Sequence, residues 1–186
     1  MDKTVRGTPS MTADDRRAVN ATESNTKDPS TIDGIMGALY GSISFLPDQA
    51  PDWARLRGLF LPGGRLIPPG MNGELGVKVL DVDNFIAWSR DGLNRSELRH
   101  QGFHEVEIAR QTHRFGNIAH IFSTYEWRHA PSDAEPLGRG INSVQLLWDR
   151  GRWWIVTIFW EEENAESPIP DAYLWNGRGR RACDSR

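Results

Sequence analysis

The sequence predicts an α+β domain in which helices come first and an antiparallel sheet follows. Apolar residues recur at helical spacing in the first third of the chain, whereas four later segments are rich in β-branched and aromatic residues. Short turn-like breaks separate these four segments, and consecutive strands with short connections pair as antiparallel neighbours. The predicted strands are Phe103–His113, Ile118–His129, Arg139–Trp148 and Trp153–Glu162.

The helices and smaller strands follow from caps and breakers. Ser30 or Thr31 can cap a first helix that reaches about Phe45. A second, short helix covers Trp53–Phe60 and is stopped by the glycines at 63 and 64. A short edge strand is expected at Arg65–Pro68.

Two further elements precede the long strands. Gly73–Leu80 alternates weakly and is expected to form another strand. Asp81 or Asp83 then caps a third helix that runs to about Leu93. The layout is therefore three helices before a four-stranded meander, which is α+β rather than α/β.

Bulk composition fits one folded domain between two polar ends. The 186 residues carry a formal charge of -3, so no overall field favours nucleic acid or an anionic membrane. Cys183 is the only cysteine, which excludes an internal disulfide. No apolar run approaches the roughly 20 residues of a membrane-spanning helix. We expect a cytoplasmic protein with a polar tail over residues 1–30, a domain over 31–176 and a basic tail over 177–186.

The order of these elements resembles the nuclear transport factor 2-like (NTF2-like) superfamily, together with the last-strand sequence Gly-Arg-Trp-Trp-Ile-Val-Thr-Ile-Phe-Trp-Glu at 151–161. Members of that superfamily include SnoaL-type polyketide cyclases, ketosteroid isomerases and scytalone dehydratase. The resemblance covers roughly residues 32–163. It implies a cystatin-like cone, in which a strongly curved sheet wraps around three N-terminal helices and the open end is a pocket.

The resemblance also implies which side chains face that pocket. Matching the last strand to the steroid isomerases puts Trp160 on their pocket tryptophan, with Val156 and Ile158 on the same face. The same gapless match places Ser143 on their oxyanion-binding aspartic acid, beside Ile141 and Gln145. Tyr40, within Ala-Leu-Tyr, resembles their oxyanion-hole tyrosine.

Strand alternation extends this inner face. If Arg114 pairs with Ile118 across the first hairpin, Glu107 lies opposite Tyr125 and Glu105 lies opposite Trp127, all facing inward. The complete predicted pocket is Tyr40, Phe60, Trp88, Glu107, Ser123, Tyr125, Ser143, Gln145 and Trp160.

Two functions remain open at this point. Pro68 occupies the position of the isomerases' catalytic base, and proline cannot take a proton. The sequence therefore favours binding of a small, mostly apolar, oxygenated molecule, without a cofactor. The alternative is an enzyme of isomerase, dehydratase or cyclase type, in which Glu107 moves a proton and Tyr40 polarises an oxygen. A purely structural role for Glu107, as a hydrogen-bond partner of Tyr125 or Ser123, is also open.

The convex, outer face of the sheet is expected to be apolar, which predicts a homodimer through that face. In the alternative, the N-terminal tail or the segment 168–175 folds back over part of it. The five histidines do not converge on one face in this register, so no metal site is expected. The outer set comprises Val106, Ile108, Ile118, Phe122, Val144, Leu146, Trp148, Ile155 and Phe159.

Overall fold

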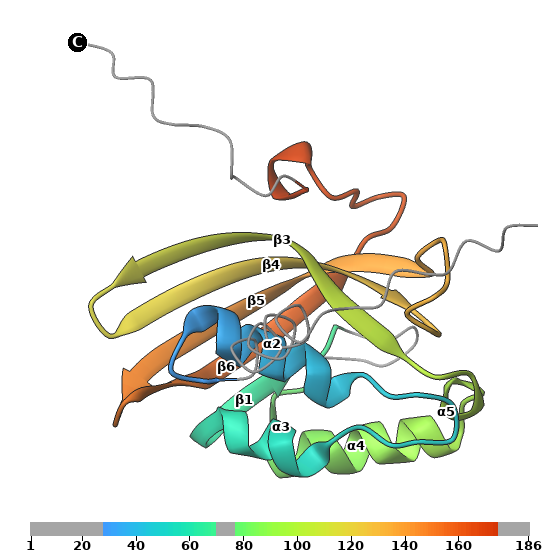
Figure 1. Cartoon of the computed structure of the whole chain (residues 1–186), viewed down its shortest axis with the longest axis horizontal. Helices are drawn as coiled ribbons and strands as arrows, with labels where there is room; N and C mark the ends of the chain where they lie inside the picture. Colours follow the sequence, from blue (N-terminus) through green and yellow to red (C-terminus); the bar gives the residue numbers. More distant parts are fainter. Residues whose placement is uncertain (1–27, 70–76, 175–186) are drawn as a thin grey trace, which may run out of the picture.

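The computed structural model describes residues 28–69 and 77–174, in which helices lie on one face of a single sheet (Figure 1). The strand order is β2-β1-β6-β5-β4-β3, and every neighbouring pair is antiparallel except β1 with β6. The α+β class is thus confirmed. The elements are α2 (Ile32–Ile43), α3 (Trp53–Leu59), β1 (Phe60–Ile67), β2 (Leu80–Asp81), α4 (Val82–Asn94), α5 (Leu98–Gln101), β3 (His104–Phe115), β4 (Ile118–Arg128), β5 (Gly138–Asp149), β6 (Arg152–Glu162) and the 3-10 helix η1 (Asp171–Tyr173).

Each of the three longer helices begins at a side-chain cap. Thr31 accepts a hydrogen bond from the backbone N–H of Gly34, and Asp52 and Asp81 accept equivalent bonds three residues ahead. Thr31 and Asp81, rather than Ser30 and Asp83, are therefore the caps. Helix α2 stops before Phe45 because the backbone of Phe45 pairs with that of Phe103.

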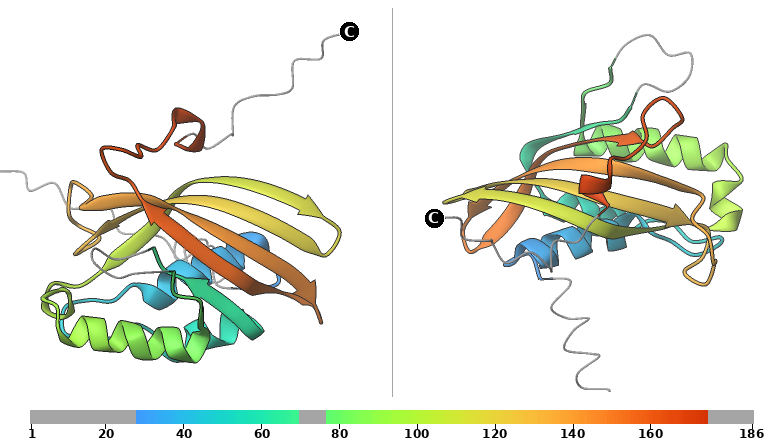
Figure 2. Two further views of the ribbon diagram at one scale, coloured as in Figure 1. Left: turned by 180° about the vertical axis from the view of Figure 1, so that it is seen from behind. Right: turned by 90° about the horizontal axis from the view of Figure 1, so that it is seen from above.

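The core lies between these helices and the inner face of the sheet (Figure 2). Ile35 and Met36 of α2 and Leu56 of α3 are fully buried against Ile121 of β4 and Ile155 of β6. Burying an aliphatic side chain of this size contributes about 1.5–3 kcal/mol before ordering costs, so this layer holds the helices on the sheet.

The four long strands are confirmed to within two residues at each end, whereas the smaller strands differ from expectation. β1 starts directly after α3 and pairs in parallel with β6, so it is not an edge. The expected strand Gly73–Leu80 is reduced to β2, and its first four residues lie outside the described part. Residues 1–27 of the expected N-terminal tail over 1–30, and the whole expected tail over 177–186, also lie outside it.

A β-bulge corrects the predicted register of the first hairpin. The turn pairs Phe115 with Ile118, one residue away from the expected pairing of Arg114. An extra residue at Ile108 then shifts the ladder back, so Glu107 does face Tyr125. The expected position of Glu107 is therefore reached by two one-residue changes that cancel.

The predicted inner face of β5 is wrong by one residue. Tyr125 pairs with Gly140 and Ser123 with Asn142, so the even-numbered residues of β5 face the helices. Ile141, Ser143 and Gln145 consequently lie on the outer face. Residues expected on the outer face but found on the inner face are Val144, Leu146 and Trp148 on β5 and Ile155 on β6. Val156, which was expected to face inward, is the extra residue of a bulge in β6, and its side chain faces outward.

Part of the outer face is covered by the segment 168–174, called the arm here. It lies on the opposite side of the sheet from the helices (Figure 1). Thr124 donates to the Tyr173 carbonyl at 2.6 Å, Gln111 donates to the Ala172 carbonyl at 3.0 Å, and the Phe122 and Tyr173 rings lie 5.0 Å apart. The expected fold-back is therefore present. Between residues 28 and 174, outside the gap at 70–76, no helix has the length and apolar character needed to cross a membrane.

Candidate ligand-binding site

A cavity of about 330 Å³ lies between α2, α3 and α4 and the inner face of the sheet. Its walls are mainly aromatic and aliphatic. Helices contribute Leu39, Ile43, Trp53, Leu56, Phe85 and Leu93, and the loops and strands contribute Phe45, Phe103, Tyr125, Trp127, Ile158 and Trp160. A concave, mostly apolar site with few polar groups is the usual form of a small-molecule pocket.

Three polar side chains reach this cavity from three neighbouring strands. Glu105 comes from β3, Tyr125 from β4 and Asn142 from β5, and the Asn142 amide nitrogen lies 3.3 Å from Oε1 of Glu105. Ser89 of α4 and Glu162 at the end of β6 are the other polar lining residues.

Glu105 is a buried carboxyl that has no cationic partner among the described residues. The residue is 8% exposed, and burial raises its pKa to about 8, against the lowering effect of the Asn142 hydrogen bond. The charge of Glu162 raises the pKa of Glu105 further. At neutral pH Glu105 therefore carries a proton and can donate a hydrogen bond.

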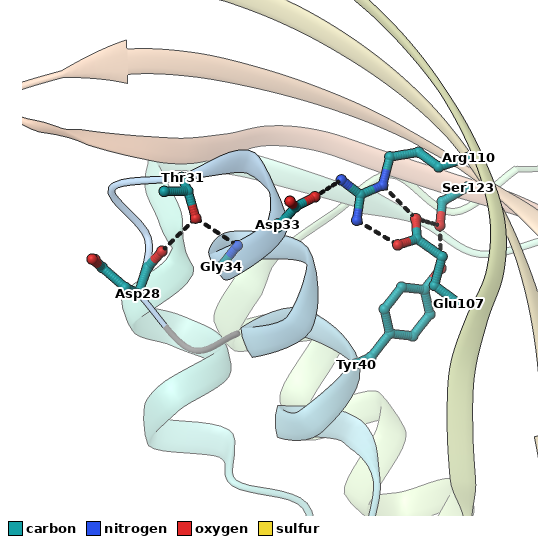
Figure 3. Close-up of polar contacts among 8 residues, drawn as sticks. All are labelled: Asp28, Thr31, Asp33, Gly34, Tyr40, Glu107, Arg110 and Ser123. Atoms are coloured by element: carbon teal, nitrogen blue, oxygen red, sulfur yellow. Dashed lines mark hydrogen bonds and ion pairs between the residues drawn. The ribbon is translucent and has the colours of Figure 1, made fainter. Parts of the chain in front are cut away.

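Behind the cavity wall, Glu107 belongs to a different polar cluster (Figure 3). Arg110 donates to both carboxylate oxygens of Glu107 and also pairs with Asp33 of α2 at 2.6 Å. Ser123 donates to Glu107 at 2.6 Å, and the Tyr40 hydroxyl lies 2.6 Å from the Ser123 oxygen.

Tyr40 connects that cluster to the cavity. The Asn142 amide donates to the Tyr40 hydroxyl at 3.2 Å, so Asn142 contacts both Tyr40 and Glu105. Burial and the nearby Glu105 raise the pKa of both Tyr40 and Tyr125, so both phenols keep their protons. The two tyrosines therefore act through hydrogen bonds.

Comparison with known proteins supports the fold of this site. No family model and no curated protein matches the sequence. An NTF2-like protein with a cystatin-like fold from Novosphingobium aromaticivorans matches with a TM-score of 0.54 and 14% identity, over 84% of this chain and 94% of that one. The chain has the NTF2-like fold.

Two other solved structures match to a similar extent. A protein of unknown function from Mycobacterium tuberculosis has a TM-score of 0.53 and 14% identity, covering 86% of this chain and 82% of its own. The hexachlorocyclohexane dehydrochlorinase LinA (type 2) has a TM-score of 0.51 and 6% identity, covering 80% and 90%. At such identities the NTF2-like likeness extends to the fold alone.

Within the NTF2-like fold, the residues predicted from sequence fall into five places. Tyr125 and Trp160 line the cavity, and Tyr40, Ser123 and Glu107 form the cluster behind it. Phe60 is buried in the core, and Trp88 packs beside Phe85 without lining the cavity. Ser143 and Gln145 lie on the outer face, where Ser143 is 2.9 Å from the His120 ring nitrogen. Whether any of them contacts a ligand stays a prediction.

Two central residues of the site, Glu105 and Asn142, were not selected from the sequence. The predicted register puts Glu105 on the inner face together with Glu107. The signal that distinguishes the two carboxyl groups is whether a basic residue lies nearby. Arg110 follows Glu107 on the same face across the bulge, whereas no basic residue lines the cavity near Glu105. Asn142 was missed because the predicted inner face of β5 is wrong by one residue.

Metal binding finds no support among the residues that the structure describes. No group of three or more His, Cys, Asp or Glu side chains there is placed to hold an ion. The histidines have separate partners, such as Asp48 for His100 and the Gly102 carbonyl for His129.

Proposed function

We propose that this protein binds a small, mostly apolar molecule that carries an oxygen atom. The ligand's body packs against the aromatic wall, and its oxygen meets Glu105 and Tyr125. The observation that carries this proposal is the convergence of three polar side chains, from β3, β4 and β5, in an otherwise apolar cavity. Such groups orient a ligand while the walls supply most of the affinity.

Size and charge narrow the ligand further. A volume of about 330 Å³ is near the lower end of ligand pockets, which suits a molecule of one or two rings. The lining residues include two carboxyl groups, Glu105 and Glu162, and neither lysine nor arginine. Anionic ligands are therefore disfavoured relative to neutral ones.

The test is to measure the binding of two matched probes to the protein by calorimetry. 2-Acetonaphthone carries a ketone oxygen, whereas 2-ethylnaphthalene has a similar shape without one. We expect the ketone to bind about tenfold more tightly, which corresponds to one hydrogen bond of about 1.4 kcal/mol. Trp160→Ala should weaken both probes by opening the wall, and Trp154→Ala, at a half-buried tryptophan that does not line the cavity, is the control. If neither probe binds at its solubility limit, or both bind equally, the proposal is wrong.

The second candidate is an enzyme of isomerase, dehydratase or cyclase type, with Glu105 in place of Glu107 as the acid or base. The observation that favours it is the pKa of about 8 for Glu105, because a general base works best near the operating pH. Glu107 is held by Arg110 and does not line the cavity.

Proton transfer at a ketone can be followed without knowing the natural substrate. In heavy water, abstraction of a methyl proton of 2-acetonaphthone and return of a deuteron replaces hydrogen by deuterium, which proton NMR detects. Acceleration by the wild type that Glu105→Gln abolishes without loss of affinity would identify an enzyme. Exchange at the buffer rate would leave binding as the function.

A further inference from the structure

A chain of hydrogen bonds with a fixed donor direction runs from Arg110 toward the cavity. Arginine has only donors, and Arg110 gives two of them to the Glu107 carboxylate, which therefore acts as an acceptor. Both side chains are largely buried, at 19% and 18% exposure, so this pair is the rigid start of the chain.

The donor direction of the chain continues through the hydroxyl groups of Ser123 and Tyr40. The Ser123 hydroxyl has one proton and donates it to Glu107. The Ser123 oxygen must therefore accept the hydrogen bond that links it to Tyr40, so the Tyr40 hydroxyl is the donor in that contact (Figure 3).

The last step fixes the orientation of the Asn142 side-chain amide. Because the Tyr40 proton points to Ser123, the Tyr40 oxygen can only accept from Asn142, which places the amide nitrogen of Asn142 toward it. The second hydrogen on the same nitrogen reaches Oε1 of Glu105. Oε1 is thereby an acceptor, and the proton of the neutral carboxyl belongs on Oε2.

We propose that this chain makes Glu105 present a hydrogen-bond donor to the cavity, so that the site selects a neutral acceptor such as a ketone, with Glu107 as a positioning residue. This deepens the proposed function and rests on it for the ligand. Glu107 acts at a distance, through Ser123, Tyr40 and Asn142.

The groups around Glu105 agree with a donor role. Tyr40 of α2 and Tyr125 of β4 are neutral phenols, and Glu162 of β6 is an acid that opposes ionisation of Glu105. Glu107, on the same strand, is compensated by Arg110. Among the described lining residues there is no lysine, arginine or histidine to stabilise a carboxylate at this position.

The first experiment needs no ligand. The carbon-13 carboxyl signal of Glu105 is titrated by NMR in the wild type, in Ser123→Ala and in Glu107→Gln. Both variants free Asn142 to turn away, and since its hydrogen bond lowers the pKa of Glu105, that pKa should rise by about one unit. Asp33→Asn is the control, because it removes only the exposed partner of Arg110 and leaves the pair with Glu107 intact.

The second experiment measures selection with two probes of the same shape. 2-Acetonaphthone is an acceptor, and the ammonium form of 1-(2-naphthyl)ethylamine is a donor. We expect the wild type at pH 7 to prefer the ketone, and Ser123→Ala and Glu107→Gln to reduce that preference about tenfold. The double variant should lose no more of the preference for the ketone than either single variant, because both substitutions break the same chain of hydrogen bonds.

These results separate the two proposals. If no probe binds but the Glu105 signal shifts as expected, the proposed function is wrong and the chain stands. If folded Ser123→Ala and Glu107→Gln proteins leave the pKa of Glu105 unchanged, the positioning role is overturned. Tighter wild-type binding of the ammonium probe would overturn the acceptor preference.

Discussion

Glu105 and Glu107 are two residues apart on β3 and face the same side of the sheet, yet their neighbours give them different chemistry. Glu107 receives two hydrogen bonds from Arg110 and one from Ser123. Glu105 receives one weak bond from Asn142 and otherwise faces aromatic rings and another acid. Burial favours the protonated form of Glu105, whereas Glu107 accepts three hydrogen bonds away from the cavity, so Glu105 rather than Glu107 is the candidate for presenting a proton to the cavity.

The first residue-scale prediction concerns stability against pH. The pKa of Glu105 is about 8 in the folded protein against an ordinary 4.5, so between these values the unfolded chain loses a proton that the folded protein keeps. The contribution of Glu105 to stability is therefore intact below pH 4.5 and lost as pH rises toward 8, at about 1.4 kcal/mol for each unit.

Glu105→Gln should remove that loss. Measured by urea unfolding from pH 5 to pH 9, the variant should gain stability relative to the wild type as pH rises, with a plateau above pH 8. Glu166→Gln, at an exposed acid, is the control. A constant difference between Glu105→Gln and wild type across this range would contradict the raised pKa.

The second residue-scale prediction concerns Gly140, which faces Tyr125 across the ladder. A Cβ at this position would meet the Tyr125 hydroxyl and the Glu161 carbonyl. Gly140→Ala should therefore destabilise the fold by about 1–3 kcal/mol and weaken ketone binding by displacing the phenol. Gly92→Ala on α4, where nothing lies within 4 Å, should instead be neutral or stabilising. Equal melting temperatures for the two variants would contradict this packing.

At the scale of elements, caps and long strands were predictable because their causes are local. Thr31 and Asp81 bond to backbone groups three residues away, and β4 pairs with β5 without a register shift. Bulges have no local signal of that kind. The extra residues at Ile108 and Val156 reverse the alternation of β3 and β6, and only pairing with a neighbouring strand reveals them.

The same limit explains the errors in the predicted site. A gapless match to the steroid isomerases carried Ser143 and Gln145 inward, whereas the register set by Gly140 and Tyr125 turns Asn142 inward. A one-residue slip exchanges the whole face of a strand, so the polar half of a site is lost while its aromatic half, on β4 and β6, is kept.

The prediction at this scale concerns the arm. Tyr173 packs on Phe122, and its carbonyl accepts from Thr124. Tyr173→Ala should cost about 1–2 kcal/mol, seen as a melting temperature lower by roughly 2–8 °C. Asp171→Ala, at an exposed position of the same arm, is the control. An unchanged melting temperature for Tyr173→Ala would show that the arm adds no stability.

At the scale of the whole molecule, no described residue covers an apolar region of the outer face at the end of the first hairpin. This hairpin-end patch consists of Phe115 (83% exposed), Ile118 (56% exposed), Leu147 and Val156. We propose that two copies of the chain associate through it, because a two-fold axis lets one patch cover its own copy.

Ile118→Lys should convert such a dimer to a monomer by placing a charge in the centre of the contact. Light scattering at high micromolar concentration measures the change in mass. Leu46→Lys, at a residue 50% exposed in the loop after α2, is the matched control and should not change the mass. A wild type that is monomeric at that concentration would end this proposal.

The parallel pairing of β1 with β6 has a consequence for how the chain is made. Phe60 and Leu66 find their partners on β6, Ile155 and Ile158, only about 90 residues later. At 5–20 residues per second, a ribosome needs roughly 5–20 s to cover that distance. During this interval β1 has only the two-residue strand β2 beside it, and its β6 side is unpaired. A nascent chain arrested before Arg152 should therefore be cleaved readily by protease, whereas one extended past Tyr173 and clear of the exit tunnel should resist.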